Sequence, residues 1–425
     1  MLSARAFAGA WRKRLEAAPP ERRLGRDAYL SLLIHFLFQF GASMAGIFLT
    51  LYLWRMTESL WVNGMYHIVA FAATLTGFLF GGGAAKRKDR LYVYRAGLLL
   101  TALFYLSVLF AGERVAEWYV LFAVFSGLAG AFYWTGYLVL MYDVSRDDNR
   151  IHYLAVNTIA FTSAGMIGPA LAGRIISGND GLTGYSLVFG IASVMFLLAA
   201  LASFKIGASP SKRRAYYLRL SVQVMKRERR WAKALAALFF MGVLNGLMLF
   251  LPNLLLYQVL PREEWIGYLG MLFSGSMIAV SALISKYAKE ESATAYLTAS
   301  AIGFVAGASL LFLRLNAATA IGFLTVYSLM APLQTNAFNA VYYKQIGKLP
   351  PKGQFRVESV VLREVALNAG RIASIWALIS FADGFGGSEL AWVLFAGAVS
   401  QLLLPFLARE PANRSRVRPP RRIAE

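Results

Sequence analysis

Residues 205–233, KIGASPSKRRAYYLRLSVQVMKRERRWAK, form the one long polar connector in a chain that otherwise consists of apolar runs. The ten lysines and arginines of this connector are too costly to place inside a bilayer. A membrane-spanning helix needs about 20 mostly apolar residues, and six such runs lie on each side of the connector. The connector therefore divides the chain into two predicted bundles of six spans each.

The predicted spans set the domain boundaries. The runs cover 28–54, 60–85, 91–112, 118–142, 151–173 and 181–204, then 234–260, 265–285, 292–313, 315–343, 357–382 and 390–408. The two bundles then occupy 28–204 and 234–408, with a linker at 205–233 and tails at 1–27 and 409–425. Because the runs are continuous and lack strict alternation, they predict helices rather than the strands of a membrane barrel.

Composition excludes a soluble protein. Of the 425 residues, 58% are hydrophobic and only 15% are charged, and the mean hydropathy is +0.53. A soluble domain carries about 25% charged residues. We therefore expect an all-α integral membrane protein with about twelve transmembrane helices. The N-terminal tail has no apolar segment of its own and is not expected to be a cleaved signal peptide.

The net charge of +21 comes from basic residues gathered on one side of the predicted membrane. The tails, the linker, the loops and the adjoining ends of the spans on that side hold 37 Lys and Arg residues, whereas the opposite loops hold 5 and Arg371 lies deeper inside a span. Positive residues are retained on the cytoplasmic side, so we expect a multi-pass protein of the cell membrane with both termini in the cytoplasm. This distribution also argues against a nucleic-acid partner, because the charges follow the loops between spans instead of forming one patch.

The numbers of cysteines and histidines argue against disulfides and metal sites. The chain has no cysteine, which excludes disulfides and thiolate metal sites, and its three histidines are scattered. We therefore predict no metal and no cofactor.

The span at 151–173 contains GMIGPALAG, in which Gly165, Pro169 and Gly173 recur at i, i+4 and i+8, with Gly168 beside the proline. Such a small face suits close helix packing in any polytopic protein. Six spans, a basic linker, six more spans and inside termini together resemble the major facilitator superfamily. GMIGPALAG is similar to the exporter-associated G-P-x-x-G-G signature of that family, with Ala172 replacing one glycine, and it implies export. Within the superfamily, Tyr133-Trp134 followed by the polar loop from Asp143 resembles a bacterial YqgE-like subgroup.

The predicted span at 357–382 carries ionisable residues that are expensive in a membrane and therefore usually functional. Glu364, Asn368 and Arg371 stand at i, i+4 and i+7 and form one polar stripe. Glu364 is the candidate for carrying a coupling proton, and Arg371 is the candidate for anchoring an anionic group or closing an ion pair. A purely structural pair between Glu364 and Arg371 is the alternative. Arg363 is expected on another face of the helix.

Asp143 ends the fourth predicted span, where the helix dipole disfavours a carboxylate. Arg146 or Arg150 could compensate its charge, either as part of a cytoplasmic gate that breaks when the halves rock or as a static surface pair.

The resemblance also implies which spans line the cargo cavity, because the first, fourth, seventh and tenth spans do so in that superfamily. These spans carry a set of amides and aromatic side chains. The set comprises His35, Gln39, Tyr133, Trp134, Tyr137, Asn245, Asn253, Gln334, Asn336 and Asn339. Pro252 and Pro332 lie in two of the same spans and predict bends. Each amide could instead form an ordinary hydrogen bond between helices.

The expected function is secondary active transport of a small polar or amphipathic solute by alternating access. Protons are the expected coupling ion, export as an antiporter is favoured over import, and a monomer in the lipid bilayer is expected. A lipid flippase on the same fold is one alternative. A polytopic membrane enzyme is another, although it would require a cluster of carboxylates or histidines near one membrane face.

Overall fold

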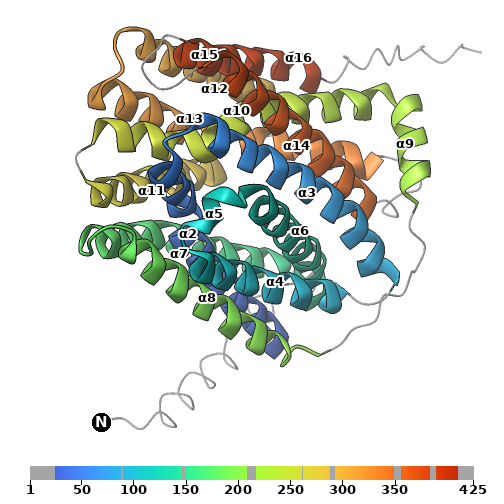
Figure 1. Cartoon of the computed structure of the whole chain (residues 1–425). Helices are drawn as coiled ribbons and strands as arrows, with labels where there is room; N and C mark the ends of the chain where they lie inside the picture. Colours follow the sequence, from blue (N-terminus) through green and yellow to red (C-terminus); the bar gives the residue numbers. More distant parts are fainter. Residues whose placement is uncertain are drawn as a thin grey trace, which may run out of the picture.

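The computed structural model describes residues 24–87, 90–145, 149–207, 217–260, 262–287, 292–348, 356–382 and 389–409. Within these ranges every regular element is a helix, and the long helices run roughly side by side (Figure 1). This architecture follows from the solvent, because a chain crossing lipid must satisfy its backbone hydrogen bonds within each segment.

The first bundle contains α2 to α8. Its helices are α2 (Arg26–Thr57), α3 (Leu60–Arg87), α4 (Arg90–Ala111), the short α5 (Arg114–Glu117), α6 (Tyr119–Val144), α7 (Arg150–Ser177) and α8 (Thr183–Ser203). Helix α9 (Leu218–Arg227) lies within the predicted linker.

The second bundle contains α10 to α16. Its helices are α10 (Arg229–Val259), α11 (Glu263–Tyr287), α12 (Ala293–Ser309) with η3 (Leu310–Phe312), α13 (Ala317–Lys348), α14 (Arg356–Phe381), and α15 (Glu389–Ser400) with η4 (Gln401–Leu403) and α16 (Leu404–Ala408).

The expected multi-pass membrane fold is confirmed. Among the described residues, eleven helices are long and apolar enough to cross a membrane. Helix α14 is the twelfth long helix, and it differs because five charged residues interrupt its apolar sequence, among them Glu364 and Arg371. Helix boundaries agree with the predicted spans to within a few residues, and the largest differences are the early start of α10 at Arg229 and the late end of α13 at Lys348.

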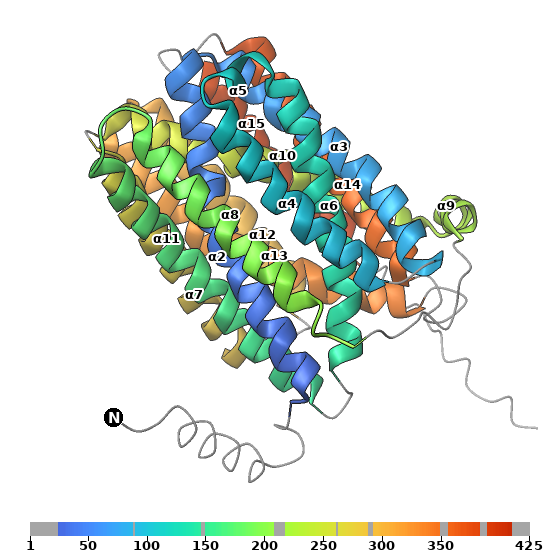
Figure 2. The ribbon, with the colours of Figure 1, turned by 60° about the horizontal axis from the view of Figure 1, so that its bottom comes forward.

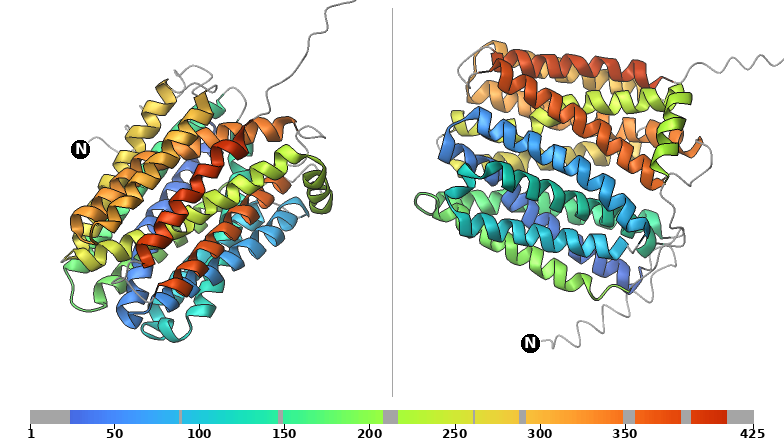
Figure 3. Two further views of the ribbon diagram at one scale, coloured as in Figure 1. Left: turned by 90° about the horizontal axis from the view of Figure 1, so that it is seen from above. Right: turned by 45° about the vertical axis from the view of Figure 1, so that its right-hand side comes forward.

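The helices of each bundle pack mainly among themselves. Helix α6 packs against α3 and α4, and α2 packs against α7 and α8, whereas α10 packs against α14 and α12 packs against α13. The two bundles lie side by side, one blue to green and the other yellow to red (Figures 2 and 3). They meet where α7 contacts α11, where α3 contacts α14 and where α2 contacts α10.

Large apolar side chains cover much of the molecular surface. Phe80, Phe110 and Leu313 are 73%, 83% and 78% exposed, which would be a liability in water. A surface of this kind is suited to lipid acyl chains.

The helices begin and finish at two opposite ends of the molecule. We call the end at which α2 begins at Arg26 and α8 ends at Ser203 the basic end, and it is the end predicted to face the cytoplasm. The end at which α2 finishes at Thr57 and α11 begins at Glu263 is the opposite end. Helix α9 lies across the basic end of the second bundle, where it contacts α10 and α14 (Figure 3).

Candidate functional site

Helices α10 and α14 approach so closely that their backbones are in contact. A Cβ atom on Gly246 would lie 2.6 Å from the Cα of Arg371 and 2.7 Å from the Oγ of Ser374. Gly242 and Gly370 meet the backbone of the facing helix in the same way. Only glycine permits such an approach, because it has no Cβ. This packing holds Arg371 against α10 near the middle of the bundle.

The Arg371 guanidinium is held by two amides and one aromatic ring. Its Nε donates to Oδ1 of Asn245 at 2.8 Å, and its Nη1 donates to Oδ1 of Asn368 at 3.0 Å. Its Cζ lies 5.2 Å from the ring centroid of Phe71, which is close enough for a cation–π interaction. Since Phe71 belongs to α3, this contact joins the two bundles. These three partners are neutral, so they leave the positive charge uncompensated.

The predicted polar stripe on α14 is present, but its charges are arranged differently. Asn368 contacts Arg371 and donates from Nδ2 to the backbone carbonyl of Glu364 at 2.8 Å. Among the ion pairs of the described residues, Glu364 is joined to Arg363, with 4.0 Å between Oε1 and Nε. No such pair joins Glu364 to Arg371. Seven residues span about 10 Å of helix, and Asn368 lies between the two groups.

A pocket of about 190 Å³ lies beside Arg371, between α10, α13 and α14. Arg363 and Arg371 are its charged lining residues. The sequence places Arg363 on another face, yet both arginines reach the pocket. Residues eight apart on a helix differ by only about 80° around its axis, and two long side chains bridge that angle.

Three of the predicted cavity residues of the second bundle line this pocket, namely Asn245, Gln334 and Asn339. Gln334 also donates to Oε1 of Gln401 at 3.2 Å, so it ties α13 to η4. The lining runs from Asn245 and Arg371 in the middle of the bundle toward the basic end, where α13 finishes and α14 begins.

Two further amides lie elsewhere. Asn336 donates to the backbone carbonyl of Pro332 at 2.9 Å within α13, and Asn253 is half-buried in α10 outside the pocket lining. Pro252 and Pro332 both lie inside their helices.

The predicted residues of the first bundle form one packed aromatic cluster. Nδ1 of His35 and the hydroxyl of Tyr133 are hydrogen-bonded at 2.5 Å, and the His35 ring stacks on Tyr137 with 4.0 Å between centroids. Trp134 meets the same imidazole edge-on at 6.0 Å. His35, Tyr133 and Tyr137 are almost fully buried. Contact with a cargo would therefore require these helices to move. Gln39 lies one turn further along α2 and is half-buried.

Asp143 lies at the end of α6 and lines a second cavity, of about 370 Å³, at the basic end. Arg26 and Asp27 line the same cavity. The side chain of Arg150 lies outside the described part of the chain, so the pairing of Asp143 with Arg150 stays a prediction.

The GMIGPALAG segment of α7 packs across the boundary between the bundles. A Cβ on Gly267 of α11 would lie 2.6 Å from the carbonyl oxygen of Pro169, and one on Gly173 would lie 3.1 Å from that of Glu263. Gly168 packs instead on α2, against Ser43. A Cβ on Gly165 would meet no atom within 4 Å. The backbone contact between α7 and α11 therefore lies nearest the opposite end. Toward the middle of the bundle it becomes a side-chain contact, since a Cβ on Gly275 would lie 3.8 Å from Sδ of Met166.

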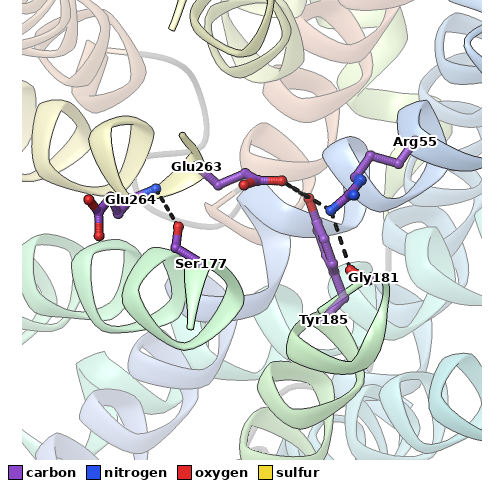
Figure 4. A network of polar contacts seen from close by, with 6 residues as sticks. All are labelled: Arg55, Ser177, Gly181, Tyr185, Glu263 and Glu264. Carbon is purple, nitrogen blue, oxygen red and sulfur yellow. Dashed lines mark hydrogen bonds and ion pairs between the residues drawn. The ribbon is translucent and has the colours of Figure 1, made fainter. Parts of the chain in front are cut away.

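A polar network closes the same end of the molecule (Figure 4). Nη1 of Arg55, at the end of α2, lies 3.1 Å from Oε1 of Glu263 and also donates to the carbonyl of Gly181 at 3.3 Å. The hydroxyl of Tyr185 donates to the same carboxylate oxygen at 3.4 Å. We call Arg55, Tyr185 and Glu263 the latch. Because Glu263 comes from α11 and the other two residues from α2 and α8, the latch joins the two bundles.

A backbone contact adds to the latch. The N–H of Glu264 donates to Oγ of Ser177 at 3.0 Å, from α11 to α7 (Figure 4). Gly181 has φ +61°, a conformation that strongly favours glycine, and this turn presents its carbonyl to Arg55.

Sequence reasoning missed the latch residues and Phe71. Arg55 appears in the sequence only as the single basic residue of its loop, and 208 positions separate it from Glu263. One signal was available. An arginine and an adjacent pair of acids, Glu263 and Glu264, stand at span ends on the side that holds few basic residues.

The comparisons with known proteins agree with this architecture. The sequence profile described as Major Facilitator Superfamily matches residues 31–354. This chain belongs to the Major Facilitator Superfamily. The resemblance to YqgE-like proteins is also confirmed: the chain is 28% identical to YqgE of Bacillus subtilis (strain 168) over 339 residues, which is 80% of this chain and 79% of that protein. A protein from the sodM 3' region of Geobacillus stearothermophilus is 31% identical over 169 residues, 40% of this chain and 79% of that one.

Solved superfamily structures share the fold. A D-xylose–proton symporter matches with a TM-score of 0.68 at 12% identity, covering 89% of this chain and 96% of that one. The nucleoside transporter NupG matches with a TM-score of 0.68 at 12% identity, covering 90% and 99%. The human organic anion transporter MFSD10 matches with a TM-score of 0.62 at 16% identity, covering 92% and 100%. Superfamily membership and this fold indicate a secondary transporter with a small-molecule substrate.

Proposed function

We propose that this superfamily member moves a small polar or amphipathic solute across the cell membrane by alternating access, and that the structure is the state open toward the basic end. One observation carries the proposal. The tightest described contacts of α11 with the first bundle, through Gly267 and Glu263, lie at the opposite end, whereas the pocket beside Arg371 extends toward the basic end. One side is latched while the cavity lies on the other, as alternating access requires.

We further propose that protons drive transport and that the direction is export. Glu364 supports proton coupling, because its side chain is only 15% exposed, belongs to a predicted membrane span and contacts Arg363 of the pocket. A carboxylate that gains and loses a proton there changes the charge balance of the pocket. Export rests on the GMIGPALAG segment, in which Pro169 and Gly173 pack at the boundary between the bundles.

The absence of native cysteine makes alternating access directly testable. Ser177 and Glu264 face each other across the closed end, with 3.0 Å between Oγ and the backbone nitrogen. Cysteines introduced together as Ser177→Cys and Glu264→Cys should form a crosslink on oxidation. In proteoliposomes, solute flux driven by a pH gradient should fall on oxidation and return on reduction.

The two single-cysteine variants are the controls, and oxidation should leave their flux unchanged. A crosslinked protein that transports at the full rate would refute the alternating-access proposal. A cargo screen with and without the pH gradient then tests coupling and direction. A lipid flippase would instead move labelled lipid between leaflets in the same vesicles.

A further inference from the structure

The pocket beside Arg371 holds more positive than negative charge. Two guanidinium groups, of Arg363 and Arg371, line it. The carboxylate of Glu364 interacts with both groups. It forms an ion pair with Arg363 at 4.0 Å, and it attracts Arg371 electrostatically without direct contact. Among the described residues, one carboxylate thus faces two guanidinium groups, which leaves an excess positive charge beside the pocket. Such a charge is costly unless a partner neutralises it.

The same arginines also keep unused hydrogen-bond donors. A guanidinium has five N–H groups, and the described hydrogen bonds of Arg371 to Asn245 and Asn368 use two of them. Nε of Arg363 is buried and has no acceptor among the described residues. A buried donor without an acceptor costs about 1–3 kcal/mol. Both the charge and the donors therefore call for an anionic acceptor.

The remaining lining selects the kind of anion. Tyr327, Thr335 and Asn339 offer neutral polar groups, while Leu238, Leu244 and Leu367 form an apolar wall. An inorganic ion would leave this wall unused. An organic body would cover it. The volume of about 190 Å³ slightly exceeds the roughly 150 Å³ of an engineered cavity that holds benzene, so a ring with one acidic group fits.

We infer that this pocket binds a small organic anion, with Arg371 and Arg363 as the groups that receive its carboxylate, and that such anions are the cargo class. The planar guanidinium of arginine matches a carboxylate with two parallel hydrogen bonds. This inference rests on the proposed transport function and names its substrate class. The neutral partners of Arg371 fix its side chain without consuming its charge, as a binding site for an anion requires.

Binding of benzoate tests the inference. The purified full-length chain in phosphatidylcholine nanodiscs is titrated with radiolabelled benzoate and with benzamide, which has the same shape and no charge, at constant ionic strength. We expect benzoate to bind at least tenfold more tightly than benzamide. Acetate and inorganic phosphate, which lack the ring, should compete more weakly than benzoate. Equal affinities for benzoate and benzamide would overturn the inference.

Matched variants assign the effect to the pocket. Arg363→Gln removes a charge-assisted hydrogen bond and should weaken benzoate binding about tenfold or more. Arg314→Gln removes the same charge from an exposed position between η3 and α13 and should change affinity less than twofold. Arg371→Lys keeps the charge but loses the planar fork, and should also weaken binding. If Arg371→Lys unfolds, Arg363→Gln decides. Similar losses in the Arg363 and Arg314 variants would overturn the inference.

A lipid headgroup is the other source of an anion, and the bilayer composition distinguishes it. Benzoate affinity that persists when phosphatidylglycerol replaces phosphatidylcholine supports a soluble cargo. Loss of benzoate binding in phosphatidylglycerol would assign the site to lipid and overturn the inference. The crosslinking experiment on Ser177 and Glu264 needs no organic anion as cargo. If the crosslink stops flux but benzoate does not bind, the organic-anion cargo class is therefore rejected while the alternating-access proposal is still supported.

Discussion

Replacing Arg55 by glutamine should shift this transporter toward the state that is open at the opposite end. Nη1 of Arg55 bonds to two acceptors, the Gly181 carbonyl and the Glu263 carboxylate. Gly181 belongs to the same bundle as Arg55, so that bond persists when the bundles separate. Only the bond to Glu263 crosses the boundary, and only that bond favours the closed state.

The size of the shift follows from the exposure of the pair. The side chains of Arg55 and Glu263 are 32% and 17% exposed, so the pair lies between a surface ion pair, worth up to about 1 kcal/mol, and a buried one. We assign about 1 kcal/mol to it, which corresponds to about a fivefold change in the ratio of the two states. A minor open state populated at about 5% would rise to about 20%.

Distances between spin labels report this ratio. Cysteines at Asn179 and Arg262 place labels on the two bundles at the opposite end, and cysteines at Leu154 and Leu283 do so on α7 and α11 nearer the basic end. Both pairs are exposed, and the cysteine-free chain requires no other change. In Arg55→Gln the first distance should lengthen and the second should shorten, each in the same fraction of molecules.

Arg174→Gln is the matched control. Arg174 lies 4.0 Å from Glu264 across the same boundary, but its side chain is 73% exposed. Its loss should therefore change the free-energy difference between the two states by less than about 0.5 kcal/mol. The reasoning is wrong if the Arg55 variant keeps the wild-type distances, or if the Arg174 variant moves them equally.

Three further predictions concern stability, coupling and topology. Gly246→Ala should lower the free energy of unfolding by about 1–3 kcal/mol, because the new methyl group overlaps α14 at Arg371. Gly190→Ala is the control: its Cβ would meet its nearest atom at 3.9 Å, so the same thermal melt should show almost no change in stability. Glu364→Gln should abolish uptake driven by a pH gradient while exchange of cargo continues, whereas a purely structural Glu364 would give an unstable variant that Arg363→Gln rescues. Reporter fusions at both termini should give a cytoplasmic signal, and a signal from the outside at either end would reject the predicted orientation.

Much of the fold could be predicted because its signals are local. Apolar length gives the spans, and the charged linker at 205–233 gives the division into halves. Helix α14 was identified despite its charges, and it begins at Arg356, one residue from the predicted start. The contact between Asn368 and Arg371 also follows from helical spacing.

The candidate site could be predicted only in part, because its decisive contacts are not local. Asn245 and Arg371 are 126 residues apart, and their pairing depends on how closely α10 and α14 approach. The sequence contains the glycines that allow this approach but not the partner that each one faces. Spacing also could not show that Arg363, on another face of α14, reaches the same pocket as Arg371, since spacing defines the angle of a Cα around the helix and not the reach of a long side chain.

The proline in α7 has a mechanical consequence. Its close contact with Gly267 lies eight residues from the end of the helix at Ser177 and nineteen from the start at Arg150, or about 12 Å and about 28 Å along the axis. If the bundles rock about this contact, α7 acts as a lever with arms of unequal length. A small gap at the latch then becomes a displacement more than twice as large at the basic end. Separation of the latch around Glu263 would therefore accompany a larger closing movement of α7 at the basic end.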